Sequence, residues 1–157
     1  MNYWLFKSEP HVFSFADLKS RRREPWSGVR NYQARNYMRD GMKVGDAALF
    51  YHSSCPEPGI AGVMTIASEP IADPTQFNPK DEYFDSKATP EKPIWQLVEV
   101  EWVANFVEFV PLENLRSDAA LTDMLILRKG NRLSITPVTA AEFRRACKLG
   151  GINWKQH

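Results

Sequence analysis

The residues best suited to chemistry lie between Trp26 and Asn36, where one aromatic side chain is surrounded by cations and amides. The run reads Trp-Ser-Gly-Val-Arg-Asn-Tyr-Gln-Ala-Arg-Asn. An indole face stacks on a base, amide side chains read a base edge, and arginine grips a phosphate through two parallel hydrogen bonds. A core tryptophan followed by a solvated helix face has the same composition. Both interpretations stay open on residue types alone, although Gly28 and the polar run before Trp26 favour a partly exposed indole.

Polar side chains also mark the ends of three predicted strands. Lys7-Ser8-Glu9 closes the first strand, Tyr51-His52-Ser53 closes the second, and Arg132-Leu133-Ser134 opens the last. Loops and strand ends that gather polar groups are a common way to build a pocket. We therefore expect a binding site at these ends.

Catalysis and metal binding have little support in the sequence. Cys55 follows His52 by three residues, but catalytic Cys/His pairs are assembled by the fold, and no orienting acid can be assigned. Cys55 and Cys147 form no Cys-x-x-Cys pair, so neither a disulfide framework nor a structural zinc is expected. We predict no metal, no cofactor and a reducing, cytoplasmic location.

The elements that must position these groups are short strands and well-capped helices. Aromatic and β-branched runs predict strands at 3–7, 47–51, 60–67, 94–106 and 133–136. Capping boxes predict helix starts at Ser14 and Thr139, Pro111 suits a third start, and a further helix is expected over 32–39. The residues expected in the core are Trp4, Phe6, Trp95, Val98, Val100 and Trp102.

A proline-rich stretch between Glu69 and Pro93 excludes central strands and long helices there. The remaining connections are too short for helical crossovers, which indicates a mostly antiparallel sheet of the α+β class in one domain, 1–157. No apolar run approaches the length of a membrane span. Residues 1–50 carry nine Lys or Arg against five Asp or Glu, which suggests one positively biased face.

The chain resembles the EVE domains, relatives of the YTH and PUA domains. The resemblance rests on motifs spread in order along the chain: Trp4 to Pro10, Trp26 to Asn36, Gly45-Asp46, Phe50 to Ser53, Gly59 to Gly62, Asp73 to Phe77 and Arg132 to Ser134. It implies a PUA-like fold, a small curved β-barrel surrounded by short helices. It also implies a pocket for a modified base, such as a modified cytosine in DNA or a modified RNA base, with Trp26 as one wall.

The resemblance and the strand-end pattern together predict a reader of a modified base in nucleic acid, with no membrane partner. The residues expected to bind the base are Ser8, Glu9, Trp26, Asn31, Tyr32, Tyr51, His52, Ser53 and Ser134. Those expected to bind phosphate are Lys7, Arg30, Arg35 and Arg132.

Two other functions stay open. The first is a hydrolase acting on a modified nucleoside or small amide, with Glu9 or His52 as general base and Lys7 or Arg132 stabilising developing charge. The second is a protein-interaction module that uses the acidic and aromatic residues of the 70–93 loop, which could equally form a lid over the pocket.

Overall fold

A six-stranded mixed sheet forms the centre of the computed structural model, which describes residues 1–155. The strand order is β2-β7-β4-β3-β1-β8, and only β1 and β3 run parallel. The strands are β1 (Tyr3–Ser8), β2 (Arg23–Pro25), β3 (Ala47–His52), β4 (Gly59–Ile66), β7 (Glu99–Pro111) and β8 (Ile135–Val138). The predicted, mostly antiparallel α+β fold is confirmed. The predicted single domain includes residues 156 and 157, which lie outside the described part of the chain.

Both faces of the central strands are buried. In β1, Tyr3 and Leu5 belong to one hydrophobic cluster, while Trp4 and Phe6 belong to the other. Successive side chains of a strand point to opposite faces, so a strand covered on both sides reads as a continuous apolar run. We call the Tyr3 side the first face and the Trp4 side the second face.

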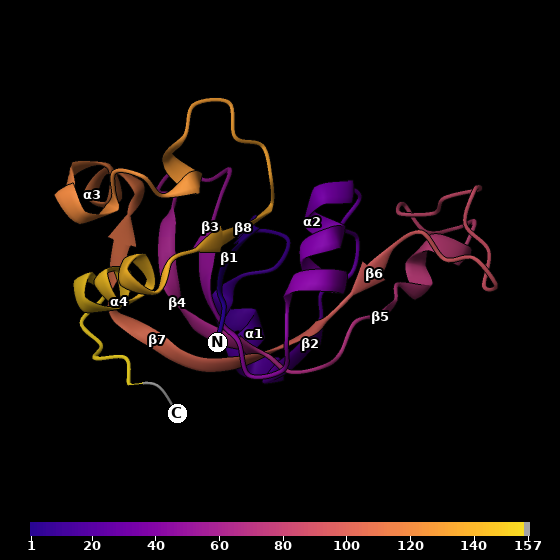
Figure 1. The fold of residues 1–157 in the computed structure, drawn as a ribbon, viewed down its shortest axis with the longest axis horizontal. Helices are drawn as coiled ribbons and strands as arrows, with labels where there is room; N and C mark the ends of the chain where they lie inside the picture. Colours follow the sequence, from indigo (N-terminus) through magenta and orange to yellow (C-terminus); the bar gives the residue numbers. More distant parts are fainter. Residues whose placement is uncertain (156–157) are drawn as a thin grey trace.

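Helices cover each face separately. The first face is covered by α3 (Leu112–Ser117), α4 (Ala140–Leu149) and the 3₁₀ turns η3 (Ala119–Leu121) and η4 (Leu125–Leu127). The second face is covered by α1 (Phe15–Arg21), α2 (Tyr32–Asn36) and the π-helical turn η1 (Tyr37–Gly41). Figure 1 shows α3 and α4 on one side of the curled sheet and α2 on the other. Among residues 1–155, no helix is long and apolar enough to cross a membrane.

The sheet curls into a half-barrel because its longest strands are bulged. The pairing of β4 with β7 shifts register twice, and the pairing of β3 with β4 shifts between Phe50 and Tyr51. Bulges bend a strand and increase its twist. Gly62 lies at this bend, where an added Cβ would collide with the Phe15 ring and the Ala104 carbonyl. The glycine therefore allows α1 to pack closely on the sheet.

The proline-rich stretch forms a separate small unit. It contains β5 (Ile71–Ala72), the 3₁₀ turn η2 (Pro74–Phe77) and β6 (Gln96–Leu97), and β5 pairs only with β6. Figure 1 shows this loop extending away from the main sheet beside α2. Gln76 is fully buried and anchors it, because its side-chain amide binds the carbonyls of Asp73 and Trp95 and accepts from the backbone N–H groups of Ile94 and Trp95.

Local signals predicted the helix starts correctly. Ser14 and Asp17, and likewise Thr139 and Glu142, exchange the two hydrogen bonds of a capping box. The predicted helix over 32–39 is α2 continued by η1, and it ends at Gly41 as expected.

Two strand predictions were wrong in their bounds. The strand predicted over 94–106 is two strands, β6 and β7, separated at Val98, because β6 turns away to pair with β5. The last strand begins at Ile135 instead of Leu133, and β2 was not predicted.

Five of the six predicted core residues are buried, and Trp102 is the exception. Trp102 does point to the second face with Val98 and Val100, as the alternation predicted. It is only partly buried, and the exposed cationic side chains of Lys19 and Arg22 lie over its ring.

Candidate nucleic-acid interface

The polar strand ends predicted to form a site do meet at one end of the sheet. Because β1 and β3 are parallel, Lys7 lies beside Tyr51 and Ser8 beside His52. The backbone N–H of Lys7 donates to the Ser134 carbonyl, 2.8 Å away, and that of Ser53 donates to the Ser8 carbonyl, 2.9 Å away. Segments far apart in the sequence are thereby joined at the same end of the sheet.

Trp26 lies at this end on the second face, half-buried, as the sequence predicted. Its ring has near-perpendicular contacts with Phe6, Phe13 and Phe50, at centroid distances of 5.2, 6.0 and 5.7 Å. Such edge-to-face packing is worth about 0.5–1.5 kcal/mol a pair beyond the buried area and fixes ring orientation. The indole is therefore a rigid aromatic surface that is partly open to solvent.

Ser8 and His52 hold the segment that carries Phe13. The Ser8 hydroxyl donates to the Phe13 carbonyl at 2.6 Å, and His52 Nε2 accepts from the Phe15 backbone N–H at 3.1 Å. Partial burial lowers the pKa of His52, which keeps the imidazole neutral so that it can accept this bond. The Ser8 oxygen keeps acceptor capacity for a ligand, whereas His52 Nε2 is already occupied and is poorly placed to act as a general base.

Tyr51 is placed differently from the prediction. It is 4% exposed and belongs to the first face, whereas its neighbour Phe50 packs on Trp26 from the second. Burial is the main cause that raises the pKa of Tyr51. Lys7 shares the first face by the same alternation, and burial lowers the pKa of its ammonium. The sheet thus separates Tyr51 and Lys7 from Trp26.

Arg30 is not available for the phosphate contact predicted for it. Its Nε and Nη2 donate to the Tyr83 carbonyl, Nη1 donates to the Val29 carbonyl and Asp73, and Nη2 also donates to Thr75. These contacts use all five N–H groups of a guanidinium. Arg30 therefore ties the proline-rich loop to the segment after Trp26.

Arg35 is also engaged within the protein. It donates to the Ile94 carbonyl and to the side chain of Asn36, and its guanidinium lies 4.9 Å from the Tyr32 ring. Tyr32 is 59% exposed and stacks on Trp95 at 4.8 Å. Tyr32 and Arg35 thus form an arginine–aromatic stack around Trp95, apart from the three rings that contact Trp26.

The remaining predicted residues are accessible or partly so. Asn31 caps α2 through Oδ1, and within residues 1–155 its amide nitrogen has no hydrogen bond. Glu9 and Arg132 are exposed, and Ser53 and Ser134 are half-buried. The Glu9 carboxylate lies 3.2 Å from His11 Nε2 at the exposed surface, and such a surface contact is easily exchanged for another partner.

Asp73 was named only as the start of a family motif, and neither Asp73 nor Tyr83 was predicted to shape this region. Asp73 is fully buried and accepts hydrogen bonds from Gly28 N, Thr75 and Arg30. The Tyr83 ring lies over Gly28, whose φ of +85° and missing Cβ permit the contact. The only local signal was Asp73 before Pro74, a helix-cap pattern. The Tyr83 contact is made across more than fifty residues of chain.

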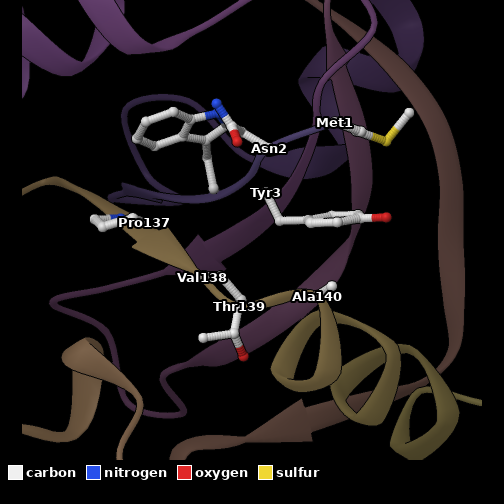
Figure 2. A pocket seen from close by; sticks show the side chains of 8 residues that line it. Met1, Asn2, Tyr3, Pro137, Val138, Thr139 and Ala140 are labelled. Carbon is white, nitrogen blue, oxygen red and sulfur yellow. The ribbon is translucent and has the colours of Figure 1, made fainter.

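Two open hollows lie elsewhere on the protein. One, of about 400 Å³, is lined by residues 1–4 and 137–140, and the other by residues that include Met1, Val44 and Glu101. Figure 2 shows the first, with Tyr3, Thr139 and Ala140 at its edge. Both involve the amino-terminal residues of the chain and neither contains a predicted site residue. Within the described chain, no three His, Cys, Asp or Glu side chains gather as metal ligands.

Similarity to known proteins extends over nearly the whole chain. The EVE domain model matches residues 2–149. Thymocyte nuclear protein 1 of Gallus gallus is 41% identical over 90% of this chain, which spans 65% of that protein's length. The human THYN1 protein, solved in complex with DNA containing 5-methylcytosine, superposes with a TM-score of 0.89 at 39% identity, over 98% of this chain and 99% of that one.

A more distant likeness concerns the fold alone. The YTH domain of the Zygosaccharomyces rouxii MRB1 protein, solved with N6-methyladenosine RNA, has a TM-score of 0.56 at 13% identity, over 99% of this chain and 88% of that one. The curled sheet and its short helices are those of a PUA-like α+β fold. From the family match and the identity to its members, the chain belongs to the EVE domain family.

Proposed function

We propose that this protein reads a modified base in nucleic acid, and that 5-methylcytosine in DNA is the first base to test. The observation that carries the proposal is the half-buried Trp26, held by three aromatic rings, in a chain 39% identical to a protein solved with 5-methylcytosine DNA. The target base leaves its stack and lies against the open face of the indole. Extrusion costs a few kcal/mol, and stacking on an aromatic side chain returns about 1–3 kcal/mol.

Three of the polar residues predicted to bind the base suit the edge of a cytosine. The exposed carboxylate of Glu9 accepts from the N4 amino group, which is the usual acidic contact to cytosine. The amide nitrogen of Asn31 donates to the O2 or N3 acceptor, since its own Oδ1 is committed to capping α2. The Ser8 oxygen supplies one further acceptor.

The test is a titration of labelled oligonucleotides that differ in one methyl group, followed by fluorescence anisotropy. The wild-type protein is expected to bind the 5-methylcytosine strand more tightly than the cytosine strand. Trp26→Ala should raise the Kd about tenfold or more, which corresponds to about 1.4 kcal/mol of lost stacking, and should remove the preference. Trp26→Phe keeps an aromatic ring against Phe6, so its Kd should lie between those of the wild type and Trp26→Ala.

Trp154→Phe is the matched control. Trp154 packs on Phe143 at the first face, 5.2 Å between centroids, so the same substitution there should leave the Kd unchanged. Equal affinity of the wild-type protein for the two strands contradicts base reading. Equal binding by wild type and Trp26→Ala shows that the indole is not the platform.

A further inference from the structure

We infer that the nucleic-acid strand next to the bound base follows a basic ridge formed by Lys19, Arg21 and Arg22, at the junction of α1 and β2. This inference rests on the proposed function and identifies the cations that contact the phosphates. Cations other than Arg30 and Arg35 must contact the phosphates, because Arg30 has no free N–H donor and Arg35 is stacked and hydrogen-bonded within the protein.

The ridge is continuous with Trp26 along one face of the sheet. The pairing of β2 with β7, and the hydrogen bonds on either side of it, place Arg22 opposite Trp102, Glu24 opposite Val100 and Trp26 opposite Val98. The Arg22 guanidinium lies over the ring of Trp102, and Trp102 and Trp26 both pack on the second face, so Arg22 and Trp26 lie on the same side of the sheet. Four residues at about 3.3 Å each place the two backbone positions about 13 Å apart, which is a few nucleotides of a strand.

Two cations of the ridge are not neutralised. The Arg22 guanidinium lies 4.8 Å from the Trp102 ring centre, and Lys19 Nζ lies 5.4 Å from it. Both residues are exposed, and within residues 1–155 neither forms an ion pair. Stacking on the indole orients the guanidinium and leaves its N–H edge free, the arrangement with which arginine grips a phosphate.

Arg21 connects this pair to the base site. Its guanidinium lies 5.4 Å from the Phe13 ring, and Phe13 contacts Trp26. Arg21 also pairs with Glu24 at 2.8 Å, but its side chain is 60% exposed. Such a surface pair contributes little stability, so Arg21 can exchange Glu24 for a phosphate at small cost.

The backbone of Arg22 is a second observation that favours a role in binding. Its φ is +68°, a left-handed conformation that suits glycine, and its N–H closes α1 on the Leu18 carbonyl. An exposed arginine in this conformation is strained, and strain of this kind gathers at functional positions. Glycine at position 22 removes the strain and the cation together, and so separates binding from folding.

The test measures the salt dependence of binding to a single-stranded 5-methylcytosine oligonucleotide. The double variant Lys19→Gln/Arg22→Gly should bind more weakly than wild type. Its slope of log affinity against log salt should be less negative by about 1.4, or about 0.7 per lost phosphate contact. Its free energy of unfolding should stay equal or rise. The ratio of Kd values for cytosine and 5-methylcytosine should not change, because phosphate contacts do not read sequence.

The matched control is Arg144→Gln/Lys148→Gln, which removes two exposed cations from α4 on the first face. Its slope should equal that of wild type. An unchanged slope in the ridge variant, or an equal loss in the control, overturns the inference. Failure of base reading is recognised separately, as equal wild-type affinity for the two strands while the slopes still differ.

Discussion

Replacing Asp73 with asparagine should detach the proline-rich loop from the segment that follows Trp26. The Asp73 carboxylate is fully buried. It accepts from Gly28 N at 2.8 Å, Thr75 N at 2.9 Å, Thr75 Oγ1 at 2.6 Å and Arg30 Nη1 at 3.1 Å. Asparagine keeps one acceptor oxygen and turns an amide N–H₂ either towards the N–H and O–H donors of Thr75 or towards the N–H donors of Gly28 and Arg30. One set of donors then loses its acceptor.

The expected loss of unfolding free energy is about 3 kcal/mol. Removing one partner of a buried ion pair costs about 3–5 kcal/mol. The lower end applies here because Arg30 keeps its bonds to the Tyr83 and Val29 carbonyls and its side chain is 21% exposed. Since a domain of this size has about 5–15 kcal/mol of stability, the variant should still fold.

Chemical denaturation measures this loss, with Asp81→Asn as the control. Asp81 Oδ1 accepts from the Tyr83 backbone N–H within the same loop, and an asparagine oxygen makes the same turn. The control should therefore lose less than about 0.5 kcal/mol. If Asp73→Asn loses as little as Asp81→Asn, the carboxylate does not hold the loop, and the role assigned to Arg30 is wrong.

The same carboxylate predicts a pH dependence. Burial acts to raise the pKa of Asp73, but hydrogen bonds from Thr75, Gly28 and Arg30 outweigh it and hold the pKa below its ordinary value. A folded pKa below the unfolded value of about 3.9 gives stabilisation that is complete above that pH and is lost as the pH falls through the folded pKa. The stabilities of wild type and Asp73→Asn should converge only under these acid conditions.

Two further predictions concern the second face. Val100→Ala should lower the unfolding free energy by about 1–3 kcal/mol, because Val100 is fully buried; an unchanged denaturation midpoint would show that the strand's inward face is misassigned. Since the folded pKa of His52 is lowered, its contribution is complete above the unfolded value of about 6.5 and is lost as the pH falls towards the folded pKa. His52→Gln should abolish this loss in denaturation curves between about pH 7 and pH 5, whereas His11→Gln, at an exposed residue, should retain it.

Local interactions were readable from the sequence. The capping boxes at Ser14 and Thr139 involve residues three apart, so their spacing in the chain is their spacing in space. The strand predictions rested on apolar and β-branched runs, and the inward side of Val98 and Val100 followed from a period of two. The partial exposure of Trp26 followed from its polar neighbours and the glycine after it.

The tertiary structure decided which predicted site residues share a surface. Phe50 and Tyr51 are adjacent and both apolar enough for either face, so only the parallel pairing with β1 and the covering helices place Phe50 on Trp26 and Tyr51 in the other cluster. The sequence alone contains no signal for this choice, because both faces of β3 are buried.

The tertiary structure also decided which cations are free to bind a phosphate. Arg30, Arg35 and Arg22 look alike in the sequence, but a guanidinium is free for phosphate only if the fold brings it no acceptor. Asp73 reaches Arg30 across forty-three residues and the Ile94 carbonyl reaches Arg35 across fifty-nine, whereas Arg22 meets the face of Trp102. The sequence therefore determined where rings, caps and cations occur along the chain, and long-range hydrogen bonding decided which cations remain for a ligand.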